Sequence, residues 1–314
     1  MDTRAIIKAS SFLILTIISI PANVFVCCAF LHSCLIGAWP QTADIILCHL
    51  AFANLMVAFT RSIPQTIAAF GYLNLFNDVG CKLTIFCFRA FRGLSISLTC
   101  LLCVYQAVAI SPATSLLAPL KISIPKHLQY IIIFLYVLYY STSVTTALNA
   151  VSSLFNNTIP PYTFNLEYCF VVGKEYSVYI SMSFGVMCRD LLFILLMIVM
   201  SGYILRLLYR HSKKMKNILS SDNSQKGGRA EAKASRAVVT LVILYIVFFG
   251  IDNVIWVYSL TISRVALLIS DIRVFFATLY TSVCPIVVIT TNPKVKRKLK
   301  LFKIKKEVQH TERI

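Results

Sequence analysis

Charged residues, and acidic residues above all, are scarce in this sequence. Only 13% of the 314 residues are charged, and 12 Asp and Glu stand against 30 Lys and Arg. Hydrophobic residues make up 58% of the chain, and the mean hydropathy is +0.78. A soluble domain carries about 45–50% apolar and about 25% charged residues. The composition therefore excludes an ordinary soluble globular protein.

The motifs of common enzyme classes are also missing. The five histidines show no metal-ligand spacing, and there is no His-Glu-x-x-His, no Gly-x-Ser-x-Gly and no glycine-rich phosphate loop. We therefore expect no enzyme, no cofactor and no metal site. Two related halves, which transporters often show, are not visible, and neither is a channel filter. A seven-span transporter or channel remains as the less favoured alternative.

The sequence does contain seven apolar stretches of about 20 residues or more, the length that crosses a ~30 Å hydrocarbon core. They cover residues 9–31, 43–70, 82–110, 128–152, 176–208, 237–262 and 271–291. Because lipid offers the backbone no hydrogen-bond partner, these stretches must be helices. The first is too long for a cleaved signal peptide, and no small-residue cleavage site follows it. The sequence predicts an all-α membrane protein, a seven-transmembrane helix bundle in one domain, 1–314.

The distribution of basic residues predicts the orientation. With the N-terminus outside, the cytoplasmic side holds 20 of the 30 Lys and Arg, and the outer side holds six, Arg273 among them. This asymmetry follows the positive-inside rule. The net charge of +18 is therefore a topology signal, and we expect no nucleic-acid partner.

The cytoplasmic tail begins at 292 with Asn292-Pro293, which breaks the last span. Val295, Leu299 and Phe302 then recur at helical spacing among many lysines. This pattern predicts a short basic amphipathic helix that lies on the anionic inner leaflet of the lipid bilayer. An unstructured basic anchor is the alternative.

Two of the eleven cysteines, Cys81 and Cys169, fall in outer connections, which face an oxidising compartment. We expect a disulfide between them, with two free thiols as the alternative. Most other cysteines lie within or at the ends of spans, where a thiol acts as a small apolar group. In the same outer loop as Cys169, the triplet "NNT" makes Asn156 a candidate N-glycosylation site.

Four arginines interrupt the spans, although a charge at the bilayer centre costs at least ~2.5–3.5 kcal/mol. They are Arg61, Arg89, Arg92 and Arg189. Arg89 and Arg92 are three residues apart, so they share a helix face near the middle of the membrane. Only two acids in the spans, Asp190 and Asp252, can offset the four charges. The arginines either bind a ligand or form a structural lock, in which Arg189, Arg92 or both pair with Asp190 and the rest with backbone carbonyls.

Several stretches together resemble one receptor family. They are "FRGLSISLTCLLCVYQAVAISP" at 91–112, "LLYRH" at 207–211 and "SDIRVFFATLYTSVCPIVVI" at 270–289. Their combination is similar to the vomeronasal type-1 receptors, from about residue 10 to 300, and the seventh-span stretch favours the fish olfactory receptors related to class A. Bitter-taste receptors, a distant alternative, lack "RGLSIS" and "LLYRH".

The resemblance implies a bundle of rhodopsin-like architecture and a G-protein-coupled chemoreceptor in the plasma membrane of olfactory sensory neurons. Its small-molecule ligand would be an odorant or pheromone, and its partner a heterotrimeric G protein of the inhibitory or Go type. The sequence departs from rhodopsin-like receptors in general at Asn54, where Asp is usual, and at "VYQ", 104–106, which replaces Asp-Arg-Tyr. "CPIVV" at 284–288 also replaces Asn-Pro-x-x-Tyr. The activation switch is therefore undefined.

For such a receptor we expect the ligand between the helices and the G protein at their cytoplasmic ends. The expected ligand-binding residues are Arg89, Arg92, Arg189, Asp190, Asp252, Tyr258, Glu167 and Tyr168, with Arg61 as either ligand-binding or structural. The expected G-protein contacts are Gln106, Ile110, Pro112, Arg206, Arg210 and Lys213. We expect Arg92 to meet a ligand carboxylate, because a guanidinium and a carboxylate form a bidentate, charge-assisted pair.

Overall fold

The computed structural model describes residues 3–35, 41–72, 75–154, 160, 163–173, 176–217, 225–260, 267–292 and 294–299. The helices are α1 (Thr3–Leu35), α2 (Thr42–Val57), the π-helix η1 (Ala58–Ser62), α3 (Ile63–Ala69), α4 (Asp78–Ile110), α5 (Leu120–Leu148), α6 (Tyr176–Asn217), α7 (Gln225–Leu260) and α8 (Leu267–Thr291). The segments α2, η1 and α3 form one continuous span. Within the described residues, seven helical stretches are long and apolar enough to cross a membrane, so the predicted fold class is confirmed.

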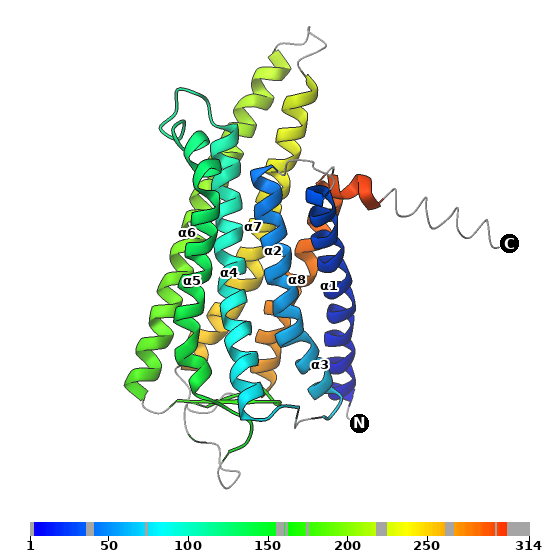
Figure 1. Ribbon diagram of the computed structural model, residues 1–314, viewed down its shortest axis with the longest axis vertical. Coiled ribbons are helices and arrows are strands. Elements are labelled where there is room, and N and C mark those ends of the chain that lie inside the picture. Colours follow the sequence, from blue (N-terminus) through cyan, green and yellow to red (C-terminus); the bar gives the residue numbers. More distant parts are fainter. Residues whose placement is uncertain are drawn as a thin grey trace, which may run out of the picture.

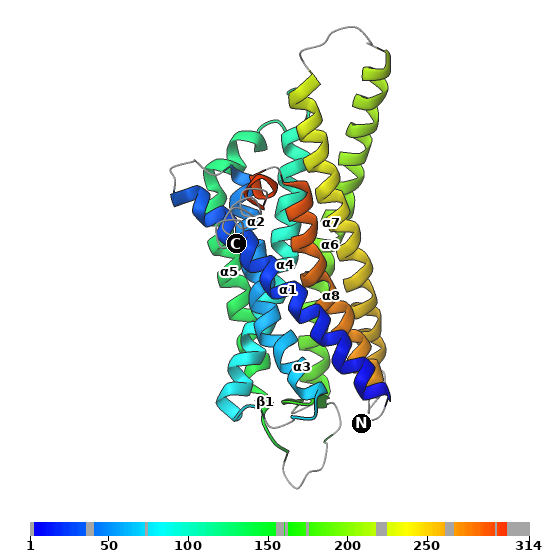
Figure 2. The ribbon, with the colours of Figure 1, turned by 90° about the vertical axis from the view of Figure 1, so that its right-hand side faces the viewer.

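The helices stand side by side in one bundle, and α6 and α7 project beyond the others at one end (Figure 1). Both are longer than the apolar stretches that predict them, because α6 continues to Asn217 and α7 begins at Gln225. We call this the far end. The disulfide end is the opposite one, where the N-terminus and the short strands lie (Figures 1 and 2).

Helix α4 is the centre of the bundle. In its apolar stretch 72% of the residues are buried, against 22–50% in the other six spans. Small side chains such as Ala90 and Ser97 are fully buried on α4, and they allow neighbouring helices to approach closely. The closest approach is at Gly93, where an added Cβ would lie 2.2 Å from two ring carbons of Tyr139 on α5. Only glycine fits at this position.

The π-helix in the second span has a local cause in the sequence. Pro64 has no N–H to donate within the helix, and its ring clashes with the carbonyl four residues earlier. The backbone adopts the wider turn of the π-helix η1 immediately before Pro64, which accommodates the proline ring. Arg61 belongs to η1, and its side chain is turned into the bundle with 5% of the residue exposed.

A small antiparallel sheet covers the disulfide end. Its strands are β1 (Ala150–Val151), β2 (Thr163–Asn165) and β3 (Phe170–Val172), in the order β1-β3-β2. Cys169, which precedes β3, forms a disulfide with Cys81 in the first turn of α4. The predicted disulfide is therefore confirmed, and it fastens the sheet to the central helix. Asn156 lies outside the described residues.

The described part of the tail packs against the bundle at the far end. Residues 294–299 are helical, and the Asn292 side chain caps this helix by accepting from the N–H groups of Lys294 and Val295. Val295 was expected on the membrane-facing side, but it is 1% exposed and packs into the hydrophobic core. An ion pair between Lys294 and Asp44 of α2 holds the helix in place. Phe302 lies outside the described residues.

The contact between α4 and α5 at Gly93 gives the first prediction. Gly93→Ala should lower the thermal unfolding midpoint of the purified protein, because the new methyl group overlaps the Tyr139 ring. Overpacking of this kind costs about 1–3 kcal/mol. Gly202→Ala on α6 is the matched control, since an added Cβ there meets nothing within 4 Å. Equal midpoints for the two variants would contradict the close packing.

Candidate functional site

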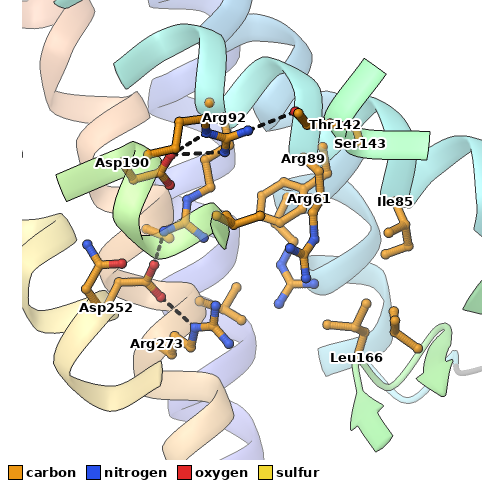
Figure 3. Close-up of a pocket in the computed structure, with 18 residues that line it drawn as sticks. Arg61, Ile85, Arg89, Arg92, Thr142, Ser143, Leu166, Asp190, Asp252 and Arg273 are labelled. Carbon is orange, nitrogen blue, oxygen red and sulfur yellow. Dashed lines mark hydrogen bonds and ion pairs between the residues drawn. The ribbon is translucent and has the colours of Figure 1, made fainter. Parts of the chain in front are cut away.

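A cavity of about 90 Å³ opens inside the bundle toward the disulfide end. Side chains from the second span and from α4, α5, α6, α7 and α8 line it (Figure 3). Its charged lining residues are the arginines at 61, 89, 92, 189 and 273 and the aspartates at 190 and 252. Five positive and two negative side chains give an excess of three positive charges inside an apolar bundle.

One buried carboxylate, that of Asp252 on α7, holds two of these arginines (Figure 3). Arg92 of α4 pairs with one oxygen, and Nε of Arg273 on α8 donates to the other at 2.7 Å. The Asp252 side chain is only 1% exposed. The Arg92 guanidinium also lies 5.0 Å from the ring centre of Phe249, a cation–π distance. Among the described side chains, the arrangement ties three helices to one negative charge, which two guanidiniums share.

A second ion pair joins Arg189 and Asp190, which are neighbours on α6. Nε of Arg189 donates to Asp190 at 3.0 Å, and Nη1 donates to the hydroxyl of Thr142 on α5 at 2.8 Å. The same guanidinium lies 4.5 Å from the ring centre of Tyr139. In contrast to the Asp252 group, this pair matches one positive with one negative charge.

Arg61 is surrounded by aromatic rings rather than by acids. Its Nη1 donates to the Tyr168 hydroxyl at 3.1 Å, and its guanidinium carbon lies 5.2 Å from the ring centre of Phe88. Among the described side chains, no carboxylate lies within ion-pair distance of it. A buried charge that contacts only neutral groups carries a desolvation cost that an anion in the cavity would offset.

The rim of the cavity is held by Lys8 on α1. Its ammonium group pairs with Glu167, in the turn between β2 and β3, and with Asp271 on α8 at 2.8 Å. Gln65 on α3 also donates to Glu167 at 2.9 Å. Glu167 has a φ of +69°, a conformation that non-glycine residues seldom adopt. The side-chain contacts thus keep the loop in a strained shape beside the cavity.

The structure brings most of the predicted ligand residues together. Arg61, Arg89, Arg92, Arg189, Asp190 and Asp252 all line the cavity. Tyr168 and Glu167 lie next to it, the first on Arg61 and the second on Lys8. Tyr258 is different, because it is 52% exposed and does not line the cavity.

Two expectations about charge need correction. Arg273 was counted with the outer connections, but it belongs to α8 and its guanidinium lies in the cavity. The lock at Asp190 holds Arg189, as one of the expected arrangements had it, but Arg92, which was then expected on a backbone carbonyl, pairs with Asp252. Lys8, Gln65 and Asp271 were not anticipated. Their only signal was their position near the outer ends of spans.

The residues expected to contact a G protein lie toward the far end. Pro112, Arg206 and Arg210 are exposed, and Ile110 is half-buried. Gln106 is only 9% exposed, so it does not belong to the surface in this conformation. Lys213 lies in the part of α6 whose side chains are outside the described set.

Comparisons with known proteins agree with one another. The family model of the vomeronasal organ pheromone receptors matches residues 6–301. Olfactory receptor class A-like protein 1 of Danio rerio is 39% identical over 300 residues, which cover 95% of this chain and 93% of the relative. Vomeronasal type-1 receptor 1 of gorilla and that of human are 28% and 27% identical over 286 residues, or 91% of this chain and 80% of each relative.

The different charge balance at the two aspartates gives the second prediction. Asp252→Asn should lower the thermal unfolding midpoint more than Asp190→Asn, because it leaves two buried guanidiniums without their counter-charge rather than one. Breaking a buried ion pair by removing one partner costs about 3–5 kcal/mol. The measurement is thermal unfolding of both purified variants in the same detergent. A larger drop in the unfolding midpoint for Asp190→Asn than for Asp252→Asn would show that the shared carboxylate contributes less to stability than Asp190 does.

Proposed function

Because the chain belongs to the vomeronasal type-1 receptor family, we propose that it is a chemoreceptor for a small anionic odorant or pheromone that binds in the arginine-lined cavity. Family membership makes it a multi-pass plasma-membrane receptor with a small-molecule ligand and a G-protein partner. The sign of the ligand's charge, the position of its contacts and the type of G protein belong to the proposal.

The proposed orientation places the disulfide end outside and the far end in the cytoplasm. The disulfide between Cys81 and Cys169 supports it, because such bonds persist in oxidising compartments. The excess of Lys and Arg toward the other end supports it as well. A ligand arriving from outside then meets the rim formed by Lys8 and Glu167 before it reaches the cavity.

The observation that carries the proposal is the sharing of Asp252 by Arg92 and Arg273. Among the described side chains, two positive charges share one negative charge at this buried site, and the lining as a whole carries more positive than negative groups, which favours an anionic ligand. A ligand carboxylate that binds Arg92 would leave Asp252 to Arg273, and each guanidinium would then have its own partner. A neutral ligand offers no such gain.

The exchange of partners at Asp252 also supplies a mechanism. Arg92 belongs to α4 and Asp252 to α7, so their ion pair is a direct tie between the central helix and a helix that projects at the far end (Figure 1). A ligand that replaces this tie favours conformations in which α7 is displaced from α4. The difference between the ligand's affinities for the conformations with and without the α4–α7 ion pair then determines how strongly the receptor is activated.

The size of the cavity restricts the ligand further. A cavity of about 90 Å³ is well below the ~300–1,000 Å³ of the pockets that bind drug-sized ligands. Short acids therefore fit the present conformation better than large ones. A larger ligand would require the helices around the cavity to separate.

For the G protein, we propose the inhibitory or Go type, bound at the far end. The exposed Arg206 and Arg210, toward the far end of α6, offer a basic surface to an acidic partner. Gln106 is buried here, and outward movement of α6 or α7 would uncover it. The surface and the cavity lie at opposite ends of the same helices, which is the arrangement that a transmembrane signal requires.

The third prediction concerns Arg92 and the charge of the ligand. In surface-normalised dose–response curves, Arg92→Gln should weaken an active acid roughly 10- to 150-fold, which corresponds to the ~1.5–3 kcal/mol of a hydrogen bond to a charged group. Arg92→Lys should reduce the potency of the acid less than Arg92→Gln does, because lysine keeps the positive charge. It should still reduce potency, because lysine lacks the bidentate geometry. The methyl ester of the same acid should be weak on the unmodified receptor and insensitive to both changes.

Arg189→Gln is the matched control, because it removes a cavity arginine whose charge Asp190 already balances. It should reduce the potency of the acid less than Arg92→Gln does. An ester as potent as its acid on the unmodified receptor, or an equal loss for acid and ester in Arg92→Gln, would show that no carboxylate contact exists at Arg92.

The fourth prediction concerns the cytoplasmic surface. Replacing Arg206 and Arg210 together by alanine should lower ligand-stimulated G-protein activation several-fold at unchanged surface expression, because the basic surface attracts an acidic partner. Lys126→Ala removes an exposed basic residue of α5 outside the proposed surface and should have little effect. Nucleotide exchange measured with inhibitory and Go-type proteins also tests the proposed type. Undiminished exchange in the double variant would contradict the contact.

A further inference from the structure

A second cavity, of about 290 Å³, lies at the far end. It is bounded by α1, α2 and the short helix of residues 294–299, which Figure 2 shows next to the ends of α1 and α2. It is separate from the arginine-lined cavity, with which it shares no lining residue. Neither the receptor class nor the proposed ligand accounts for it.

The walls of this cavity combine two chemistries. Phe30 and Leu31 of α1 and Ile45 of α2 form an apolar side. Lys294, Arg297 and Lys298 of the tail form a basic side. A space with an oily wall and a cationic rim is complementary to an amphiphile with a negatively charged head.

The basic side keeps positive charge available for a ligand. Lys294 is paired with Asp44, and Lys298 donates to the carbonyl of Ala29, so both lysines are held at the rim. Arg297 is exposed and makes no hydrogen bond or ion pair with any described residue. Its guanidinium is the group best placed to take a phosphate in a bidentate pair.

The apolar side indicates whether that phosphate belongs to a phospholipid or is a free ion. Leu31 is 57% exposed and Leu35, one turn on, is 82% exposed, so this face of α1 meets the lipid of the membrane. A free phosphate ion would gain nothing from such a wall. A phospholipid offers an anionic head to the basic rim and acyl chains to the wall, and the surrounding bilayer supplies it.

We propose that this cavity binds one anionic phospholipid, with its phosphate head on Arg297 and Lys298 and the start of its acyl chains against Phe30 and Leu31. With the orientation proposed above, the lipid comes from the cytoplasmic leaflet. The bound lipid would link the tail helix to α1 and α2, in addition to the ion pair of Lys294 with Asp44. The site adds a lipid ligand to the proposed odorant and G protein.

The test compares two neighbouring charge reversals, Arg297→Glu and Lys296→Glu. Both residues are exposed and both substitutions change the net charge equally, but Lys296 does not line the cavity. The purified receptor is placed in phosphatidylcholine nanodiscs with a minor fraction of phosphatidylinositol 4-phosphate. Native mass spectrometry after ejection from the nanodisc then counts the retained anionic lipids.

One phosphatidylinositol 4-phosphate should be retained by the unmodified receptor and by Lys296→Glu, and retention should fall roughly tenfold in Arg297→Glu, as expected for loss of a charge-assisted phosphate contact. Equal retention in both variants, or an equal loss in both, would overturn the proposal, the latter because it indicates general surface charge. Both arms are read without any odorant or G protein, so the outcome is independent of the proposed chemoreception.

A competition arm separates a lipid site from a phosphate site. Soluble inositol 1,4-bisphosphate at the lipid concentration should leave retention unchanged, because it lacks the chains that contact the apolar wall. Displacement of the lipid by the soluble headgroup would show that phosphate alone is recognised. In a charge-neutral arm, Ile45→Trp fills the cavity and should lose the lipid, whereas Ile133→Trp, on the exposed face of α5, should retain it. Retention in Ile45→Trp would exclude the cavity as the site.

Discussion

The bundle depends on one carboxylate that serves two guanidiniums. Asp252 joins α7 to Arg92 of the central helix and to Arg273 of α8, and it does so where its side chain is almost fully buried. Charge interactions are strongest in such a low-dielectric region, and charges without partners are most costly there. The tie between α7 and α4 follows from this shared carboxylate, the excess of arginines over acids in the described lining makes the cavity positive, and the proposed preference for an anion rests on both.

The remaining contacts around the cavity make the disulfide end of the bundle stiff. The disulfide fastens the sheet to α4, and Lys8 joins α1, the Glu167 turn and α8 in one group. Pro64 and the π-helix before it fix the direction of Arg61. Among the described side chains, every ion pair of α7 is made by Asp252, so the projecting half of this helix is tied less firmly. Motion that follows a change at Asp252 is therefore expected at the far end, where α6 and α7 extend beyond the bundle.

Much of this could be predicted from the sequence, and the limits have physical causes. Hydropathy gives the seven spans because each must cover the same hydrocarbon thickness, and it flags Arg89, Arg92 and Arg189 because charge is costly there. The pair of Arg189 with Asp190 is also readable, since the two are adjacent. The pair of Arg92 with Asp252 is not, because 160 residues separate them and only the packed bundle brings them together. Arg273 was misplaced for a related reason: a residue near the start of a span is assigned outside unless its side chain is known to point inward.

The arginine-lined cavity and the tail stretch differ in their basic residues in a way that matches the chemistry of each place. All five basic residues that line the arginine-lined cavity are arginines, whereas seven of the eight in the tail stretch 294–306 are lysines. A guanidinium is weakly hydrated and planar, which suits buried carboxylates and aromatic faces, while an ammonium is strongly hydrated and suits the wet surface of a membrane. The single arginine of that tail stretch is Arg297, at the rim of the second cavity. It stands where a fixed, bidentate contact to a phosphate would distinguish a specific site from the general attraction that the surrounding lysines provide.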